Sequence, residues 1–177
     1  MPVSGSGRGR SHRRAIERTT AVTGSILWRA ADAPRREDAI LLDTHEWVWT
    51  LDGAVEYMAP EATEVIASAA AAGRLYVSDI SFWEVSLKVA RGKLTLSIDH
   101  TLWLTRAATA PGIRGLPLAR DVLIQNTLLP GEMRGDPADR MLVAQAQLEG
   151  LSLLTCDRLI VEYAASQPGV PVCDARR

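Results

Sequence analysis

The chain has 177 residues, of which 47% are hydrophobic, and its formal net charge at pH 7 is −1. This length and apolar content predict one globular domain with a sizeable core, and the net charge gives no global sign of nucleic-acid binding. The two cysteines are too few for a disulfide framework, and every apolar run is far below membrane-spanning length. We therefore expect a cytoplasmic protein that does not enter a membrane.

Residues 1–38 differ in composition from the rest of the chain. They hold eight arginines against four acids and show no sustained hydrophobic period, whereas residues 39–177 hold twelve Lys and Arg against seventeen Asp and Glu. The first segment is predicted to be a basic, mostly disordered extension, in which residues 15–31 could form a short helix. We favour a solvated tail over an RNA-attracting arm, because charge runs at chain ends are usually solvated.

Short apolar strands alternate with helices along residues 39–177. In chain order, the pattern predicts a strand at 39–43, helices at 45–51 and 60–73, a strand at 74–79, a helix at 80–92, a short extended segment at 93–96, a helix at 99–112, a strand at 113–119, a helix at 121–129, a helix from Pro137, a strand at 151–157, a helix at 157–165 and a strand at 170–173. Gly115 and Pro117 favour an edge position for the strand at 113–119. Such alternation predicts an α/β domain with a mainly parallel sheet covered on both faces.

The stretch GDPADR at 135–140 brings two carboxylates to the start of an apolar helix. Proline is favoured at the first helical position, which makes Asp136 the N-cap and Asp139 the third helical residue. Helix capping alone explains these acids when the stretch is considered by itself. Asp139, however, lies at the tip of an apolar stripe that should face the core, where a carboxylate needs a partner, a metal ion or water.

Five acids that are far apart in the sequence are predicted at the same edge of the sheet. Asp43 and Asp157 end strands, Glu84 lies in the early turns of a helix that follows a strand, and Asp136 and Asp139 begin the helix described above. In open parallel sheets this carboxyl edge is where function is found. So many neighbouring carboxylates repel one another without a cation, and this repulsion should raise at least one pKa in the cluster.

A carboxylate cluster without His or Cys suits a hard cation that prefers oxygen ligands, namely Mg2+ or Mn2+. His45 and His100 are isolated, and we interpret them as surface or capping residues rather than ligands. One or two such ions beside a phosphodiester would polarise the phosphoryl oxygen, generate a hydroxide nucleophile and stabilise the leaving oxygen. From the residues alone, Asp43 and Asp139 are expected to bind the principal ion, and Glu84 and Asp157 to bind through water or a second ion.

Four blocks of the sequence together resemble the PIN-domain nucleases, and more narrowly the VapC-type toxins of bacterial toxin–antitoxin pairs. The blocks are ILLDTHEWVW, YVSDISFWEVSLKVARGKLTL, GDPADRMLVAQAQLEG and LSLLTCDRLIVEY, and the similarity covers about residues 39–173. It implies a three-layer α/β/α sandwich and Mg2+- or Mn2+-dependent cleavage of RNA, often tRNA or rRNA. It also implies a cognate antitoxin and a homodimer.

The resemblance places the four metal carboxylates at Asp43, Glu84, Asp139 and Asp157, with Asp136 as an accompanying acid. Hydroxyl positions beside the site fall on Thr44 and Thr155, with Ser81 as a further candidate. Ala138 stands where this subgroup often has an aromatic or bulky apolar residue, and the first 38 residues have no counterpart in the usual short N-terminus.

Several residues near these acids leave more than one interpretation open. Arg140 and Arg158 each follow a site acid and could contact RNA phosphate, although surface pairing with acids is slightly favoured. Of the tryptophans in the folded part, most should be core residues, and one or two near the site could stack on bases or contact a partner. Two other classes of function are a non-catalytic binding module with capping acids and a phosphatase that uses Asp43 as nucleophile. The phosphatase is disfavoured because His45 stands where such enzymes commonly have a second Asp.

Overall fold

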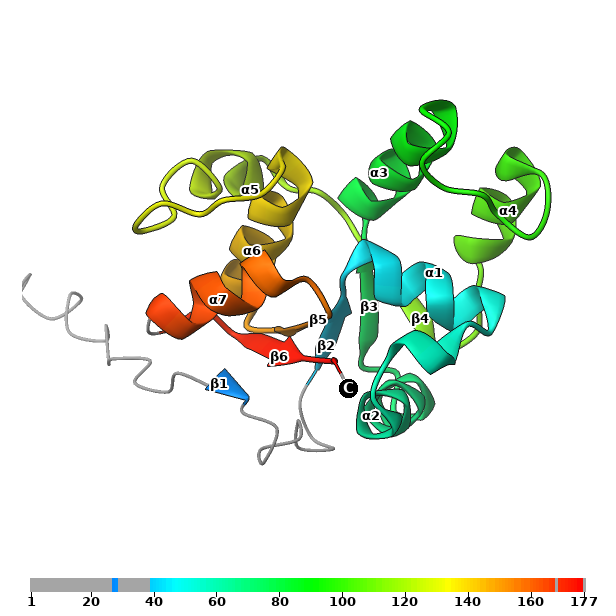
Figure 1. Cartoon of the computed structure of the whole chain (residues 1–177), viewed down its shortest axis with the longest axis horizontal. Helices are drawn as coiled ribbons and strands as arrows, with labels where there is room; N and C mark the ends of the chain where they lie inside the picture. Colours follow the sequence, from blue (N-terminus) through cyan, green and yellow to red (C-terminus); the bar gives the residue numbers. More distant parts are fainter. Residues whose placement is uncertain (1–26, 29–38, 168, 177) are drawn as a thin grey trace, which may run out of the picture.

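The computed structural model describes residues 27–28, 39–167 and 169–176, and within them a six-stranded sheet lies between helices on both of its faces (Figure 1). The strands are β1 (Leu27–Trp28), β2 (Ile40–Leu42), β3 (Leu75–Ser78), β4 (Ile113–Leu116), β5 (Ser152–Thr155) and β6 (Val172–Asp174). The helices are α1 (Thr44–Asp52), η1 (Val55–Tyr57), α2 (Pro60–Ala71), α3 (Asp79–Ala90), α4 (His100–Ala107), α5 (Arg120–Gln125), α6 (Pro137–Glu149) and α7 (Arg158–Ser166).

Neighbouring strands are all parallel and follow the order β1-β6-β5-β2-β3-β4. The predicted α/β class and mainly parallel sheet are therefore confirmed. Strand β4 lies at one edge of the sheet, as its glycine and the following proline predict. None of the helices in the described part of the chain is long and apolar enough to cross a membrane.

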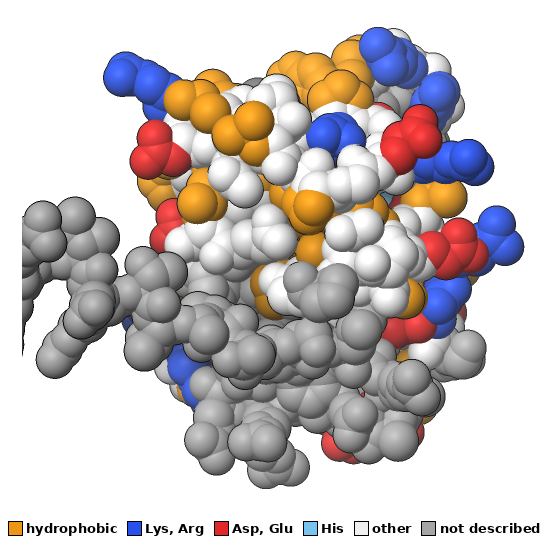
Figure 2. Space-filling model, turned by 90° about the vertical axis from the view of Figure 1, so that its left-hand side faces the viewer, with side chains coloured by type: hydrophobic (Ala, Val, Ile, Leu, Met, Phe, Trp, Pro, Cys, Tyr) orange, Lys and Arg blue, Asp and Glu red, His pale blue; other side chains and the backbone are white. Residues whose placement is uncertain are grey.

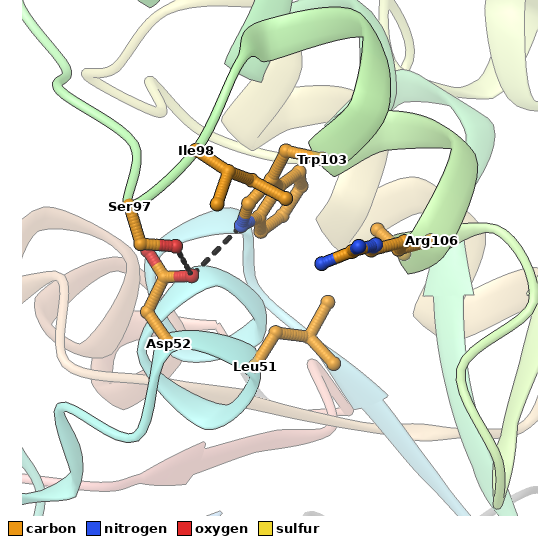
Figure 3. Close-up of a pocket in the computed structure, with 7 residues that line it drawn as sticks. Leu51, Asp52, Ser97, Ile98, Trp103 and Arg106 are labelled. Carbon is orange, nitrogen blue, oxygen red and sulfur yellow. Dashed lines mark hydrogen bonds between the residues drawn. The ribbon is translucent and has the colours of Figure 1, made fainter.

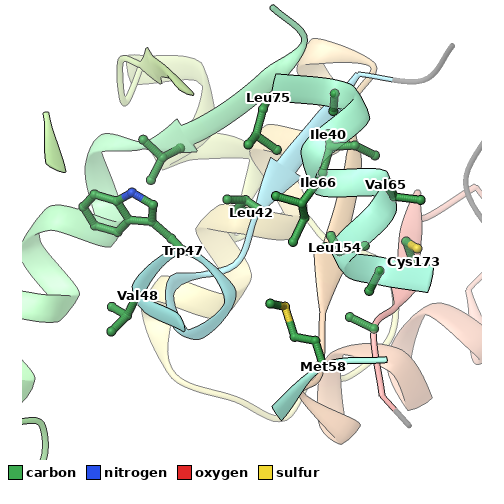
Figure 4. Packing of buried hydrophobic residues seen from close by; sticks show 14 of the residues in the cluster. Ile40, Leu42, Trp47, Val48, Met58, Val65, Ile66, Leu75, Leu154 and Cys173 are labelled. Carbon is green, nitrogen blue, oxygen red and sulfur yellow. The ribbon is translucent and has the colours of Figure 1, made fainter. Parts of the chain in front are cut away.

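Alternate side chains of the central strand β2 point into two separate hydrophobic layers, because successive residues of a strand face opposite sides of the sheet. Ile40 and Leu42 pack into the layer that contains α1 to α4 (Figure 4). Leu41 packs into the other layer with side chains of α5, α6 and α7, among them Val122, Leu142 and Ile160. This arrangement gives the three layers that the resemblance implies.

Three local features differ from the sequence-based expectations. The short helix η1 is not foreseen, and residues 93–96 form no regular element. Residues 27–28 are an extended strand that pairs with Val172 and Cys173 of β6, not part of a helix over 15–31. Such short segments carry little periodicity of their own, so pairing with a neighbour decides their conformation. The rest of the predicted N-terminal extension, residues 1–26 and 29–38, lies outside the described residues.

The order of the strands creates a topological switch point at β2. From β2 the chain moves outward to β3 and β4, and it then returns to place β5 on the other side of β2. In doubly wound sheets the crevice beyond the carboxyl ends of the strands at such a point is where ligands bind. The segments that follow β2, β3 and β5 therefore define the edge on which a functional site is expected.

Candidate metal centre

Three carboxylates meet at this edge. Glu84 of α3 and Asp136 and Asp139 at the start of α6 each offer one oxygen atom, and these oxygens lie within 4.8 Å of one another. The two helices are distant in sequence, so only folding brings the acids together. Oxygen atoms at this spacing suit a hard divalent cation, which would also relieve the repulsion between the charges.

The start of α6 is built as the sequence predicts. Asp136 is the N-cap, and its Oδ1 atom accepts hydrogen bonds from the backbone N–H groups of Ala138 at 2.8 Å and Asp139 at 3.2 Å. In return, Oδ2 of Asp139 accepts from the backbone N–H of Asp136 at 2.9 Å. This reciprocal capping box satisfies N–H groups that the helix itself leaves without partners. It uses one oxygen of each carboxylate, so a helix-capping role and a place in the acidic cluster are compatible.

Asp43 follows β2, caps α1 and is almost fully buried, with 4% of its surface exposed. One of its carboxylate oxygens accepts from the backbone N–H of Thr44, and the other accepts from the hydroxyl of Thr155. The Thr44 hydroxyl in turn donates to Oε2 of Glu84 at 2.6 Å and lies 3.1 Å from the Ser81 hydroxyl. The three predicted hydroxyl residues thus tie Asp43 and Glu84 into one buried network.

Glu84 is balanced by a cation from its own helix. Lys88 lies one turn further along α3, and its Nζ atom is 2.8 Å from Oε1 of Glu84. The same Nζ lies 3.1 Å from Nε2 of His45, which is exposed on α1, so His45 is a surface residue as predicted. Both oxygens of the buried Glu84 carboxylate therefore have polar partners.

Burial and mutual repulsion both disfavour the charged forms of the acids. Burial raises the pKa of Asp139 to about 7, and the charges of Asp136, Asp43 and Glu84 add to the rise. Burial also raises the pKa of Asp43, with a further contribution from Glu84, although hydrogen bonds from Thr155 and Thr44 and the nearby His45 oppose it. The expected rise in pKa is thus present, but loss of hydration exceeds repulsion as its cause.

Asp157, like Asp43, is a predicted carboxylate outside the close group of Glu84, Asp136 and Asp139. It is the N-cap of α7, where its Oδ1 atom accepts from the backbone N–H of Leu159 at 2.6 Å and of Ile160 at 3.3 Å. Its own backbone N–H donates to the Thr155 hydroxyl at 2.9 Å, and that hydroxyl contacts Asp43. One threonine therefore links Asp157 to the buried part of the site.

A further buried acid, Glu46, is absent from the sequence-based set. It lies in the first turn of α1 with no exposed surface, and its Oε1 atom accepts from the backbone N–H of Cys156 at 2.7 Å, whereas Oε2 has no hydrogen-bond partner. Burial, together with the charge of Asp43, raises the pKa of Glu46 to about 8. The apolar residues that follow Glu46 are the sequence feature that could have predicted its burial, since an acid in such a run is rarely solvated.

The arginines and tryptophans near the site have different roles. Among the described residues Arg140 has no acidic partner; its guanidinium donates to the carbonyl oxygens of Asn126 at 2.6 Å and Met133 at 3.2 Å and so holds the segment before α6. Arg158 forms the predicted surface pair with Glu162 at 3.3 Å. Trp47 and Trp103 are buried core residues, whereas Trp83 is 51% exposed beside Glu84.

Two hollows in the described surface lie near α3 and α4. The smaller, of about 190 Å³, lies between α1 and α4, where Asp52 accepts hydrogen bonds from Ser97 and Trp103 (Figure 3). The larger, of about 270 Å³, is a groove along α3 that includes Glu84 and Asp136. Only the second of these two includes members of the acidic cluster, so it is the one relevant to the candidate metal centre.

The buried Glu46 carboxyl predicts a pH effect on stability in the absence of metal. Because its pKa rises from 4.5 to about 8 on folding, unfolding releases its proton between these pH values, and the free energy of unfolding falls as pH rises through this window. Glu46→Gln keeps an oxygen for Cys156 but cannot ionise. Between pH 4.5 and 8, the free energy of unfolding should fall less for this variant than for the parent. The difference between the two falls should be on the order of 2–4 kcal/mol.

Urea unfolding in EDTA at a series of pH values measures this difference. Glu61→Gln is the matched control, because Glu61 also lies in the first turn of a helix but is exposed. The control should give a curve parallel to that of the parent. Parallel curves for Glu46→Gln and the parent would show that Glu46 does not ionise with a raised pKa.

Comparison with known protein families assigns most of the chain to one family. Residues 40–165 match the PIN domain family model. The chain is 29% identical over 132 residues to "Ribonuclease VapC22" of Mycobacterium tuberculosis (strain ATCC 25618 / H37Rv), and the match covers 73% of this chain and 95% of that protein. The matched family segment contains all five acids of the predicted site.

Solved structures with low sequence identity to this chain have the same fold. DNA-bound VapBC from Salmonella typhimurium matches with a TM-score of 0.53 and 19% identity over 76% of this chain and 96% of that chain. FitAcB from Neisseria gonorrhoeae matches with a TM-score of 0.50 and 22% identity, with the same shares of the two chains covered. The family match spans strands β2 to β5, the switch point and the acidic cluster, and this chain therefore belongs to the PIN-domain family.

Proposed function

We propose that this protein is a metal-dependent endoribonuclease, the toxin of a VapC-type toxin–antitoxin pair. The observation that carries the proposal is the group of carboxylates from α3 and α6 at the switch point of a PIN-domain sheet. The similar ribonuclease from Mycobacterium tuberculosis, matched over nearly its whole length, supports RNA as the substrate. The class of RNA, whether tRNA or rRNA, is taken from the family resemblance.

Mg2+ or Mn2+ is the proposed cofactor, because the site offers carboxylate and hydroxyl oxygens and no sulfur or imidazole within the close group. Asp43 and Asp139 would hold the principal ion, and Glu84 and Asp157 would bind through water or hold a second ion with the scissile phosphate. Asp136 would assist as the neighbouring acid. Because the pKa of Asp139 is about 7, ion binding there competes with a proton near neutral pH.

The chain's own residues would orient and stabilise the acids. Thr155 and Thr44 hold the Asp43 carboxylate in one orientation, and Thr44 with Ser81 positions Glu84 beside it. The capping box fixes Asp139 at the helix start, where the helix dipole also favours negative charge. A bound divalent ion supplies activation of water and of the phosphodiester. No covalent intermediate on the protein is required.

Two alternatives fit the observations less well. A binding module with purely capping acids explains the four aspartates at helix starts, but it gives no reason for the buried Glu84 carboxylate, which caps no helix and is linked to Asp43 through Thr44. A phosphatase that uses Asp43 as nucleophile commonly has a second Asp two residues later, and at that position this chain has His45, whose ring lies 3.1 Å from Lys88.

Asp139→Asn separates catalysis from capping. Asparagine can still accept the hydrogen bond from the Asp136 N–H, but it removes a charge that burial disfavours. We expect the variant to lose Mg2+-dependent RNA cleavage, to be as stable as the parent or more stable in EDTA at neutral pH, and to lose most of the thermal stabilisation that Mg2+ or Mn2+ gives the parent. The readouts are cleavage of total RNA and thermal melts with EDTA or Mn2+.

Asp121→Asn is the control for this experiment, because Asp121 lies in the first turn of α5 and is exposed. It should cut RNA and respond to Mn2+ like the parent. If Asp139→Asn cuts RNA at the parental rate, Asp139 is not a metal ligand.

The proposed partner is a cognate antitoxin, as the similarity to VapBC and FitAcB suggests. The acidic cluster favours a segment that carries Arg or Lys beside apolar anchors. We expect co-expression with the adjacent small open reading frame to give a stable complex without nuclease activity. Purification as two separate proteins that do not associate would contradict this partner.

A homodimer is also proposed, and it is supported by exposed apolar side chains around α5. Leu123, Ile124 and Leu128 are 45%, 54% and 64% exposed. On the side of the molecule that lies at the left of Figure 1, hydrophobic side chains gather in the upper half (Figure 2). A patch of this kind on one chain often marks a protein interface. The α5 region is therefore the expected contact between the two copies.

Ile124→Glu combined with Leu128→Glu tests the dimer by light scattering after gel filtration. We expect the parent to have the mass of a dimer and the variant to have that of a monomer, because burial of two carboxylates in the contact is strongly unfavourable. Leu102→Glu on α4, where the leucine is 44% exposed, is the control and should stay dimeric. A monomeric parent, or a dimeric double variant, would exclude this interface.

A further inference from the structure

The groove along α3 extends from the acidic cluster toward the end of that helix. It has a volume of about 270 Å³ and is lined by Trp83, Glu84, Leu87, Lys88, Arg91, Lys93, Asp136 and Pro137. Glu84 and Asp136 belong to the cluster itself. A molecule bound in this groove would therefore lie directly beside the candidate metal centre.

Trp83 lines this groove, and no other aromatic ring in the described part of the chain contacts its indole. It is 51% exposed, whereas Trp47 and Trp103 on the neighbouring helices are buried and stack edge to face. Trp83, Leu87 and Arg91 follow one another at intervals of four residues and so share one face of α3. An exposed indole in a groove is a platform on which a flat ring can stack.

Arg91 and Lys93 provide positive charge at the far end of the groove. Both are exposed, and within the described residues neither takes part in an ion pair. Lys88, by contrast, is paired with Glu84. Gly92 adopts a left-handed conformation with φ of 65°, which lets the Lys93 N–H bond back to the carbonyl of Lys88 at 2.8 Å. Lys93 is thereby held at the end of the helix beside Arg91.

We propose that the α3 groove binds the single-stranded RNA that flanks the scissile phosphate, with Trp83 stacked on a base and with Arg91 and Lys93 bound to backbone phosphates. This inference rests on the proposed ribonuclease function and names the residues that position its substrate. From Glu84 to Arg91 the helix rises by roughly 10 Å, room for about three nucleotides at a stacked spacing of 3.4 Å.

Charge favours RNA over an antitoxin segment as the occupant of this end of the groove. A segment that carries Arg or Lys to meet the acidic cluster would be repelled by the two unpaired cations of Arg91 and Lys93. RNA, as a polyanion, would be attracted instead. Its phosphates can contact Arg91 and Lys93 at one end of the groove and the divalent ion bound by the acids at the other. Aromatic stacking beside a cationic track is the usual way of holding a single strand.

Binding of a short fluorescein-labelled oligouridylate, followed by fluorescence anisotropy, tests the proposal. All variants are made in the Asp139→Asn background, so that cleavage does not interfere, and are measured in EDTA over a range of salt concentrations. Trp83→Leu should weaken binding by about 5- to 100-fold with an unchanged salt slope, and Trp83→Phe should retain most of the affinity. Arg91→Gln combined with Lys93→Gln should reduce the slope of log affinity against log salt by about 1.4.

Arg106→Gln is the matched control, because Arg106 lines the separate hollow between α1 and α4. It should leave both affinity and salt slope unchanged, and thermal melts should show that every variant folds. If the Trp83 and Arg91/Lys93 variants bind the oligonucleotide as the background protein does, the groove is not an RNA site. If they instead weaken only the complex with the co-expressed antitoxin, the groove is a protein surface, and the proposal is overturned.

Failure of this inference can be told from failure of the proposed function. A parent that cuts RNA, together with variants that bind normally, would refute the groove and leave the nuclease intact. A parent that cuts no RNA, together with variants that lose binding as expected, would refute the nuclease and support the groove as a site for single-stranded RNA.

Discussion

The concentration of negative charge at the switch point of the sheet is the constraint on which the rest of this structure depends. Parallel strands bring the ends of β2, β3 and β5 to one edge, and the segments that follow them carry acids. Carboxylates within 4.8 Å of one another, some of them buried, are unfavourable without compensation. The surrounding hydroxyls of Thr44 and Thr155 and the ammonium group of Lys88 provide part of that compensation in the protein itself. A bound divalent cation would provide the remainder, so the same charges that limit stability would create affinity for the ion.

The acids at the start of α6 show how one side chain can serve both the fold and the site. Asp136 and Asp139 cap the helix reciprocally, which fixes their carboxylates in the orientation that the cluster requires. The positive end of the helix dipole also lowers the penalty for placing negative charge there. A capping role is therefore compatible with the proposed role as metal ligands, because the capping hydrogen bonds use one oxygen of each carboxylate. Asp157 has the capping role at α7 but reaches the cluster only through the Thr155 hydroxyl.

The two sides of the acidic cluster differ in character. On the α3 side, Trp83 and the exposed cations at the end of the helix open toward solvent and form the groove. On the α1 side, the Glu46 carboxyl is enclosed and holds the Cys156 N–H, next to the threonine that orients Asp43. The α3 side is therefore open to solvent, as the proposed RNA groove requires, whereas α1 supports the site from within. Arg140, next to Asp139, also has a supporting role, since it fixes the loop before α6 through two carbonyl oxygens.

The α/β class, the parallel sheet and the edge that carries the acids could be predicted from the sequence, because hydrophobic periodicity and the residues at helix ends are local properties of the chain. Pro137 and the two aspartates beside it specify their helix start without reference to any other segment. Only the tertiary structure decided which acids actually meet, since contact between α3 and α6 depends on how the helices pack. It also decided that Glu46 is buried and that Arg140 binds carbonyls, because burial and hydrogen-bond partners come from segments distant in the sequence. Finally, pairing with β6 made residues 27–28 a strand, since so short a segment carries no periodicity from which its conformation could be predicted.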